Sequence, residues 1–387
     1  TSLFLKLKRT IYLMKEKGYK TLSRLNRFIA AINFFCIVGL LLAYTSTFVS
    51  PAKISLIAFF GLLYPAFLFA NTFFLVYWIL KRKKLFLLSL ITILIGYSHL
   101  SHFVQLTITN RNDPNKSTEF TIMSYNVRLF DLYNWTQNKQ TRNQIFDFLS
   151  KEDPEVICFQ EFYHQNETND WQFPTRDTLI QFLKAKNFAE GYTVNIKQNQ
   201  FFGLITLSKF PIINHAHFKF NNDKSNSFLY TDLKINEDTI RIYNAHIGSA
   251  RFSQADYEAI GAEGNYKTWP HQKANNNSQI FSRLSNAYKK RSVQTDILLK
   301  HTNNSPYPLV LCGDFNDTPV SYNYKCLTKN FCDAFTLSAN GTAGTYCSFP
   351  MIRIDYILHS KDFNSFNFKT RKEQLSDHRA ISTVIEY

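Results

Sequence analysis

Hydrophobic residues fill three long stretches near the start of the chain, and none of the three carries a charge. The stretches are residues 28–52, 54–80 and 85–110. About 20 residues, at a rise of about 1.5 Å each, cross the hydrocarbon core of a bilayer. Helices of water-soluble proteins normally keep a polar face, which these stretches lack. The pattern therefore predicts a membrane anchor over residues 1–107 with about three transmembrane helices, at 28–50, 54–80 and 85–107.

Basic residues between the stretches predict an orientation. Residues 1–27 carry eight Lys and Arg, residues 81–84 carry four more, and the connection near Lys53 carries one. Cytoplasmic flanks of membrane helices are enriched in these residues. Three spans then place residues 108–387 on the outer side of a bacterial inner membrane, in the periplasm. The third stretch is interrupted by Ser98, His99, Ser101 and His102, and the remainder is cytoplasmic if that stretch does not cross.

The pattern changes after a polar linker at residues 108–117. Short apolar runs typical of strands recur at 120–126, 156–160, 203–208, 228–235, 239–246, 308–313, 352–359 and 381–386. Helix patterns lie between them at 139–151, 177–186 and 278–301. Strands and helices mixed in this way predict an α/β (α+β) sandwich, with helices outside packed sheets, over residues 118–387.

Composition and charge narrow the function. With 45% hydrophobic and 19% charged residues, the chain is not a disordered protein. The net charge of +15 invites a nucleic-acid interpretation, but residues 1–107 carry 13 Lys and Arg against one acidic residue, while residues 108–387 carry 31 against 28. The excess belongs to the anchor, so it indicates no phosphate-binding surface on the remainder.

The six cysteines add little. They show no Cys-x-x-Cys spacing, which argues against a zinc site and against a disulfide framework. A bond between Cys326 and Cys332 stays open if this part of the chain lies outside the cell membrane.

Polar residues stand at the ends of several apolar strand runs. They are Asn126, Glu161, Asn244, His246, Asp314, Asn316, Asp355, Asp377 and His378. Any one of them alone is more simply a turn residue, a helix cap or a structural histidine. Together, the carboxylates, carboxamides and histidines suit a hard divalent cation, most naturally Mg²⁺. A cation of this kind is what hydrolysis of an anionic phosphodiester requires.

Two motifs among these residues carry a family resemblance. Gly-Asp-Phe-Asn at 313–316 and Ser-Asp-His at 376–378, in order after Asn126, Glu161 and His246, resemble the endonuclease/exonuclease/phosphatase superfamily, which includes deoxyribonucleases and neutral sphingomyelinases. Residues 202–211 are also similar to a strand motif of that group. The resemblance covers residues 118–387. It implies a four-layered sandwich of two mixed β-sheets flanked by helices, here in a membrane-anchored bacterial member.

The resemblance also implies roles for individual residues. Glu161, with Asn126 and Asp377, would bind Mg²⁺, with Mn²⁺ as an alternative. His378, held by Asp355, would orient or deprotonate the attacking water. The expected catalytic set is His246, Asp314, Asn316, Asp355 and His378. The expected substrate-binding set is Asn126, Asn244, His246 and Asn316.

The function expected from the sequence is a membrane-tethered, Mg²⁺-dependent phosphodiester hydrolase, most simply nuclease-like. A lipid phosphoesterase of the sphingomyelinase type and a small-molecule phosphoesterase stay open, as does a non-catalytic surface protein that only binds a ligand. The expected partners are a nucleic acid or a phospholipid headgroup and the bilayer itself, with no obligate protein partner. Aromatic and basic residues in an insertion at 248–277 suit nucleotide bases or a lipid headgroup, or they simply pack the loop onto the sheet. The run Lys289-Lys290-Arg291 is most simply a solvated helix face.

Overall fold

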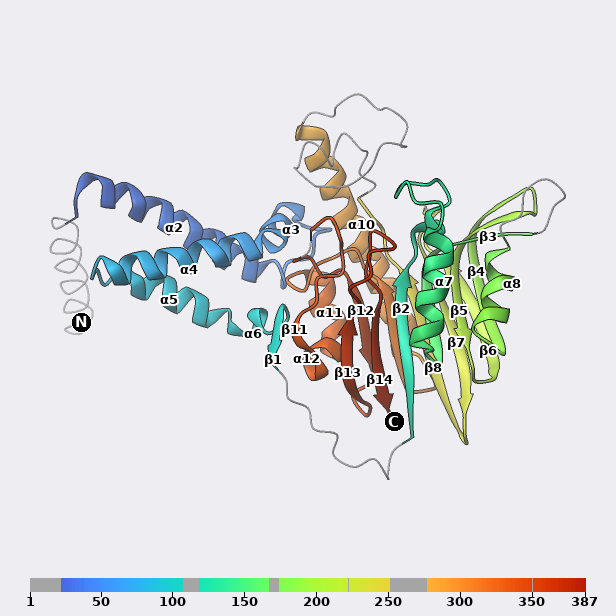
Figure 1. Ribbon diagram of the computed structural model, residues 1–387. Coiled ribbons are helices and arrows are strands. Elements are labelled where there is room, and N and C mark those ends of the chain that lie inside the picture. Colours follow the sequence, from blue (N-terminus) through green and yellow to red (C-terminus); the bar gives the residue numbers. More distant parts are fainter. Residues whose placement is uncertain (1–21, 107–117, 167–173, 222, 251–276, 350) are drawn as a thin grey trace.

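A computed structural model describes the chain over residues 22–106, 118–166, 174–221, 223–250, 277–349 and 351–387. Figure 1 shows a two-sheet sandwich with a group of helices projecting from one side of it. The predicted linker at 108–117 and most of the predicted insertion at 248–277 lie outside the described residues.

The sandwich consists of two six-stranded mixed sheets. The first has the order β13-β14-β2-β3-β5-β4, with strands Asn364–Thr370 (β13), Ile381–Glu386 (β14), Glu119–Asn126 (β2), Val156–Gln165 (β3), Gln200–Ser208 (β5) and Asn187–Ile196 (β4). The second has the order β10-β12-β9-β8-β7-β6, with strands Cys332–Asp333 (β10), Asp355–His359 (β12), Leu309–Asp314 (β9), Asp238–His246 (β8), Ser227–Ile235 (β7) and Ile212–Lys219 (β6). One parallel pair lies in each sheet, β2 with β3 and β8 with β9.

Alternating side chains create the layers. Inward residues such as Ile122, Cys158, Ile242 and Val310 form a fully buried core between the sheets. Outward residues of the first sheet pack under α7 (Thr141–Glu152) and α8 (Thr175–Phe182). Those of the second pack under α10 (Asn277–Asn303) and α11 (Tyr322–Asn330), and the short helix α12 (Ala334–Ser338) contributes Phe335 to the core between the sheets. The predicted sandwich of two mixed sheets flanked by helices is confirmed.

The N-terminal helices differ from the three continuous spans expected at 28–50, 54–80 and 85–107. Within the described residues, α2 (Arg24–Thr45) alone has the length and composition to cross a membrane. The second stretch is divided into α3 (Ser55–Leu62) and α4 (Tyr64–Leu80), which meet at a bend of 56°. The prediction of one continuous span over the third stretch is wrong, because α5 (Phe86–Ile95) is capped at Gly96 and is followed by α6 (Tyr97–Leu100) and strand β1 (Val104–Leu106).

These helices bury polar groups and expose apolar ones. Asn33 donates a hydrogen bond to Ser89 (2.9 Å) and accepts one from the indole of Trp78 (2.9 Å), so α2, α4 and α5 are joined by side-chain bonds in their interior. Large apolar side chains on the same helices stay exposed, including Phe28, Phe35, Phe69, Leu80, Leu88 and Ile95. This distribution is the reverse of that in a water-soluble helical bundle.

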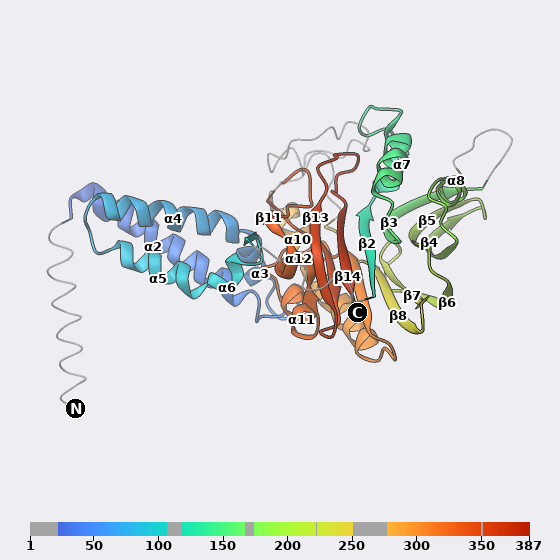
Figure 2. The same ribbon diagram turned by 60° about the horizontal axis from the view of Figure 1, so that its bottom comes forward.

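The helices are joined to the sandwich by several contacts. Strand β1 pairs with β11 (Asn340–Thr342) of the sandwich. The guanidinium of Arg353, which is buried and ion-paired with Asp333 at 2.8 Å, donates to the carbonyl of His102 at 3.1 Å. Gly61 of α3 lies so close to the carbonyl of Val320 that a Cβ there would be 2.2 Å from the oxygen. The helices and the sandwich are therefore in direct contact, and Figure 2 shows α2, α4 and α5 side by side, pointing away from it.

Candidate active site

The carboxyl end of β9 is the centre of the site. In the registers of the second sheet, Asp314 lies opposite His246 of the parallel neighbour β8 and opposite Asp355 of the antiparallel neighbour β12. Three predicted residues, far apart in the sequence, therefore lie in one row across the sheet. Asn126 reaches this row from the first sheet, where its side-chain amide donates to Oδ2 of Asp314 at 3.0 Å.

Gly313 allows this row to form. Its φ is +151°, and a Cβ at this position would lie 1.9 Å from the carbonyl oxygen of Ala245 on β8. Only glycine accommodates so close an approach of two strands. The glycine of the Gly-Asp-Phe-Asn motif thus brings Asp314 next to His246.

An irregularity in β3 turns Glu161 into the pocket. The register of β3 against β5 shifts between Phe159 and Phe162, and Glu161 has a left-handed φ of 48°. A bulge of this kind redirects one side chain while the rest of the strand keeps its alternation. As a result, Gln160 stays fully buried, whereas the side chain of Glu161 keeps 36% of its surface exposed and lies 3.8 Å from Nε2 of His246.

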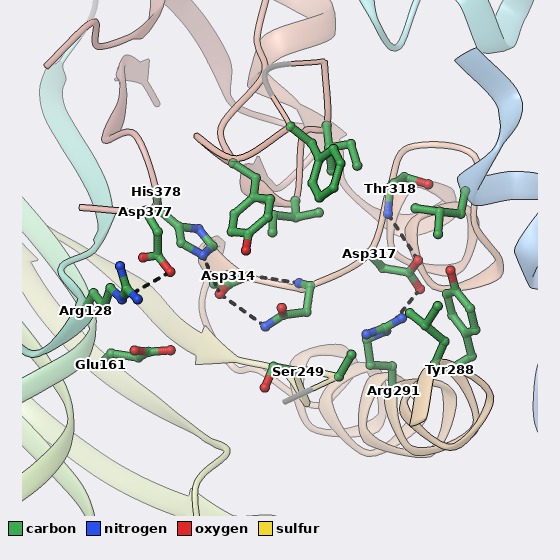
Figure 3. Close-up of a pocket in the computed structure, with 18 of the residues that line it drawn as sticks. Arg128, Glu161, Ser249, Tyr288, Arg291, Asp314, Asp317, Thr318, Asp377 and His378 are labelled. Atoms are coloured by element: carbon green, nitrogen blue, oxygen red, sulfur yellow. Dashed lines mark hydrogen bonds and ion pairs between the residues drawn. The ribbon is translucent and has the colours of Figure 1, made fainter. Parts of the chain in front are cut away.

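The turn after β2 adds a cation that the sequence did not single out. Residues 128–131, which form η1 (Arg128–Asp131), all have positive φ. This turn places the guanidinium of Arg128 4.4 Å from the ring of Trp135, with Nε 3.5 Å from the carboxylate of Asp377. Figure 3 shows Arg128, Asp377 and Glu161 together on one side of the pocket. In the sequence, Arg128 could have been noticed as a basic residue two positions after Asn126.

His378 and Asp355 form a buried pair. Nδ1 of His378 lies 2.9 Å from Oδ2 of Asp355, and its Nε2 lies 3.7 Å from Oδ2 of Asp314. Burial by itself lowers the pKa of His378, but the carboxylates of Asp355 and Asp314 outweigh it and raise that pKa well above 6.5. The pair has the geometry of a histidine held in one orientation by a carboxylate, with its other nitrogen facing the pocket.

Burial shifts the neighbouring groups as well. It raises the pKa of Asp314 to about 6, an effect reinforced by Asp355 and opposed by His378. Burial also raises the pKa of Glu161, and the nearby Asp377 adds to this shift. The pKa of His246 is lowered by burial, against the attraction of Asp314. Such shifts are typical of groups poised for proton transfer or ion binding.

The donor set suits a divalent cation. Among the described residues, ligand atoms of Asp314, Asp355 and His378 lie within 4.8 Å of one another. Two further carboxylates, Glu161 and Asp377, lie near each other, and repulsion from Asp377 raises the pKa of Glu161. The buried Nε2 of His246 has no hydrogen-bond partner. Closely spaced carboxylates and an unsatisfied nitrogen are the arrangement that a bound cation would stabilise.

The structure places Asn316 at the pocket and Asn244 away from it. Asn316 has a left-handed φ of 53°, and its amide donates to Asp314 (3.1 Å) and to the carbonyl of Ile247 (3.0 Å) at the pocket wall. Asn244 is fully buried between the sheets, where its amide donates to the carbonyls of Phe159 and Ile205 and its oxygen accepts from Gln160. Asn244 is therefore not brought to the pocket, and we assign it to joining the two sheets.

The site residues line a pocket of about 890 Å³ that continues beyond them. At its other end lie Tyr288, Arg291, Asp317 and Thr318, beside the blue ribbon of the N-terminal helices (Figure 3). The run 289–291 is thus not simply a solvated face. Arg291 is buried and pairs with Asp317 at 3.7 Å, and Lys290 pairs with Asp223 at 2.6 Å, since both extend from α10 toward the sandwich.

All six cysteines are free, including Cys326 and Cys332.

Comparison with known proteins agrees with this geometry. A family model described as Endonuclease/Exonuclease/phosphatase family matches residues 123–378. The chain belongs to this family. It is accordingly an enzyme that hydrolyses phosphoester bonds. The N-terminal helices match a second family model, described as a domain of unknown function (DUF8431), over residues 26–103.

Solved structures resemble the same part of the chain. An endonuclease/exonuclease/phosphatase from Beutenbergia cavernae has a TM-score of 0.50 and 14% identity, covering 69% of this chain and 71% of its own. A family protein from Bacteroides thetaiotaomicron has a TM-score of 0.50 and 15% identity, covering 70% of this chain and 99% of its own. At this identity the likeness concerns the fold alone. A search of curated proteins finds no match.

Proposed function

We propose that this protein is a membrane-tethered phosphodiester hydrolase that depends on Mg²⁺, with its catalytic sandwich on the outer face of a bacterial inner membrane. The observation that carries this proposal is that Glu161, Asp314, Asp377 and His378 line one pocket, with Asn126, His246 and Asp355 placed against Asp314. The set joins a proton-transferring histidine to carboxylates suited to a divalent cation. A protein that only bound a ligand would not require both.

The residues would share the chemistry as follows. Glu161, Asn126 and Asp377 would hold Mg²⁺, which when bound neutralises charge on the phosphate oxygens. Asp314 would align the attacking water, and His378, fixed by Asp355 at 2.9 Å, would handle its proton. His246 would donate a hydrogen bond to a phosphate oxygen, and Asn316, whose amide donates to Asp314, would hold that carboxylate in position.

The N-terminal helices provide the support for the proposed membrane tether and for its orientation. Their exposed apolar side chains suit lipid, and their internal hydrogen bonds satisfy the polar groups that lipid cannot. Arg24, Arg27 and Lys81–Lys84 lie at the helix ends far from the sandwich, where Tyr77 of α4 bonds Asn26 of α2 at 2.8 Å (Figures 1 and 2). Since basic ends remain in the cytoplasm, the sandwich would lie on the opposite side.

The substrate would be a phosphodiester. The resemblance favours nucleic acid, but residues 108–387 carry 31 basic against 28 acidic residues, which provides little attraction for a polyanion. A lipid phosphodiester is the second candidate. It is favoured by the apolar leucines 62 and 63, which the N-terminal helices contribute to the pocket wall.

The test is hydrolysis of bis-p-nitrophenyl phosphate by the full-length protein in detergent, with Mg²⁺, with Mn²⁺ and with a chelator. We expect turnover with either metal and none with the chelator. His378→Ala should abolish turnover, whereas His215→Ala, at an exposed histidine of β6, should not change it. Full activity in the chelator would refute the metal dependence, and full activity of His378→Ala would remove that residue from the reaction.

A further inference from the structure

The pocket that contains the site residues has a wall that hydrolysis does not use. Its lining includes the aliphatic and aromatic side chains of Leu62, Leu63, Leu284, Phe349, Ile352 and Ile354. Polar lining residues such as Glu161, Asp314 and His378 lie at the opposite end from Tyr288 and Thr318 (Figure 3). The pocket therefore combines ionic groups, including the Arg291–Asp317 pair at its other end, with an apolar wall.

Part of this apolar wall belongs to the N-terminal helices. Leu62 ends α3 and Leu63 lies at the bend before α4, where its side chain is 49% exposed. Exposure at this level leaves a leucine free to gain apolar contact with a ligand. The segment of the chain with the outward apolar surface is thus also a wall of the active-site pocket.

Contacts hold this wall in place against α10. The ring of Phe59 stacks on Phe281 with centroids 4.3 Å apart, and its edge meets Tyr288 at 5.4 Å. The hydroxyl of Ser55 lies 2.7 Å from that of Ser285. Because α3 is fixed to α10 by these contacts, the two leucines are a built part of the pocket.

Within the part of the chain that the structure describes, the charges around the pocket do not suit a polyanion. The two described arginines that line it, Arg128 and Arg291, are paired with Asp377 and Asp317 respectively. A single phosphate can be held by the metal site, but a polynucleotide needs further cations along its backbone. A ligand with one phosphodiester and a hydrocarbon portion fits the ionic groups of the site and the apolar wall beside them.

We propose that the substrate is a membrane lipid with a phosphodiester headgroup, whose hydrocarbon portion contacts Leu62 and Leu63 at the bend between α3 and α4 while its phosphate lies at Asp314 and His378. This inference rests on the proposed hydrolytic function and specifies its substrate class. The reaction adds water across one phosphorus–oxygen ester bond. It gives a phosphate monoester and an alcohol, which takes the second proton of the water.

The test uses the full-length protein with Mg²⁺ and a series of p-nitrophenyl phosphodiesters whose second ester group is methyl, butyl or octyl. The leaving group is the same throughout, so the series isolates the contribution of the apolar chain. Burial of one methylene changes affinity by about fourfold. We expect kcat/KM to rise by about tenfold or more from the methyl to the octyl ester.

Two variants separate the wall from general effects on the anchor. Leu63→Asn should lower kcat/KM for the octyl ester by about threefold or more and leave that for the methyl ester unchanged. Leu56→Asn is the matched control, because Leu56 lies on α3, the helix that ends beside Leu63, is 54% exposed and does not line the pocket. This control should keep the full dependence on chain length.

Three results would overturn the inference. A series with no dependence on chain length would do so while leaving the proposed hydrolytic function intact. Faster turnover of plasmid DNA than of the octyl ester would assign the site to nucleic acid. No turnover of any ester, the methyl compound included, would refute the proposed function itself.

Discussion

Replacing Asp355 by asparagine tests the proposed chemistry most directly. Asp355 is 2% exposed, and both its oxygens lie within 3.2 Å of Nδ1 of His378. The substitution keeps the size of the side chain and removes the charge that raises the pKa of His378. A positioned acid or base contributes about 10²–10⁴-fold to a rate, which corresponds to about 2.7–5.5 kcal/mol of barrier. We expect kcat of Asp355→Asn to fall within that range.

Stability should respond very differently. The substitution gives up one charge-assisted hydrogen bond, which contributes about 1.5–3 kcal/mol. It also removes the repulsion between Asp355 and Asp314, which lie opposite each other in neighbouring strands. Since these two effects offset each other, the net change should be about 1 kcal/mol or less, and Tm should move by about 2–4 °C at most.

The measurement combines kcat on bis-p-nitrophenyl phosphate with thermal unfolding of the same preparation. Asp147→Asn, at an exposed position of α7, is the control and should change neither quantity. If Asp355→Asn kept kcat within about threefold of the original protein, the pair would have no catalytic role. A fall in Tm of more than about 10 °C would instead attribute lost activity to unfolding.

Four further predictions concern metal, packing and pH. Glu161→Gln should raise the Tm of the metal-free protein, because it removes the repulsion between the carboxylates of Glu161 and Asp377, yet it should abolish the increase in Tm that Mg²⁺ gives the original protein. An unchanged response in the variant would exclude Glu161 as a ligand. Arg353→Met should destabilise the protein by about 3–5 kcal/mol in denaturant unfolding, since it leaves the buried Asp333 unpaired, and a loss below 1 kcal/mol would contradict this. Gly313→Ala should abolish turnover and lower Tm, because its Cβ would lie 1.9 Å from the carbonyl of Ala245; a Tm equal to that of the original protein would show that the strands can separate without cost. Burial lowers the pKa of His217 to about 4, below its ordinary 6.5, so the unfolded chain binds the proton more readily than the folded one. The free energy of unfolding should therefore fall as the pH drops from about 6.5 toward 4. His217→Gln should weaken this pH dependence in unfolding experiments, and an identical pH profile in the variant would contradict the assignment to His217.

The sequence was sufficient to predict most of the fold, and the strands it missed share a physical reason. The runs that formed β2, β9 and β14 were recognised because both faces of a central strand are covered, which makes the sequence almost continuously apolar. The unrecognised strands of the two sheets, β4, β6, β10 and β13, are their four edge strands. Edge strands are more polar and more solvated, so they lack the pattern that identifies a strand.

Site residues could be predicted from the sequence where a polar residue ends an apolar strand, as Asp314 does. It was not predictable where three-dimensional packing decides. Asn244 lies on the same face of β8 as His246, since residues two apart in a strand share a face. It is farther from the end of the strand, however, and the first sheet covers it, where it bonds the carbonyls of Phe159 and Ile205. Arg291 was expected on a solvated face because a basic run alone does not reveal that Asp317 lies within reach. The contribution of Leu63 to the pocket depends on how two segments dock, which no local pattern encodes.

The pairing of β1 with β11 and the bond from Arg353 to His102 fix the sandwich to the N-terminal helices. With those helices in a membrane, as proposed, the enzyme would meet a lipid substrate by lateral diffusion in two dimensions rather than by collision from bulk water. Its turnover would then depend on the mole fraction of substrate in the bilayer. Dilution of the membrane with inert lipid would slow the reaction even when the total amount of substrate is constant.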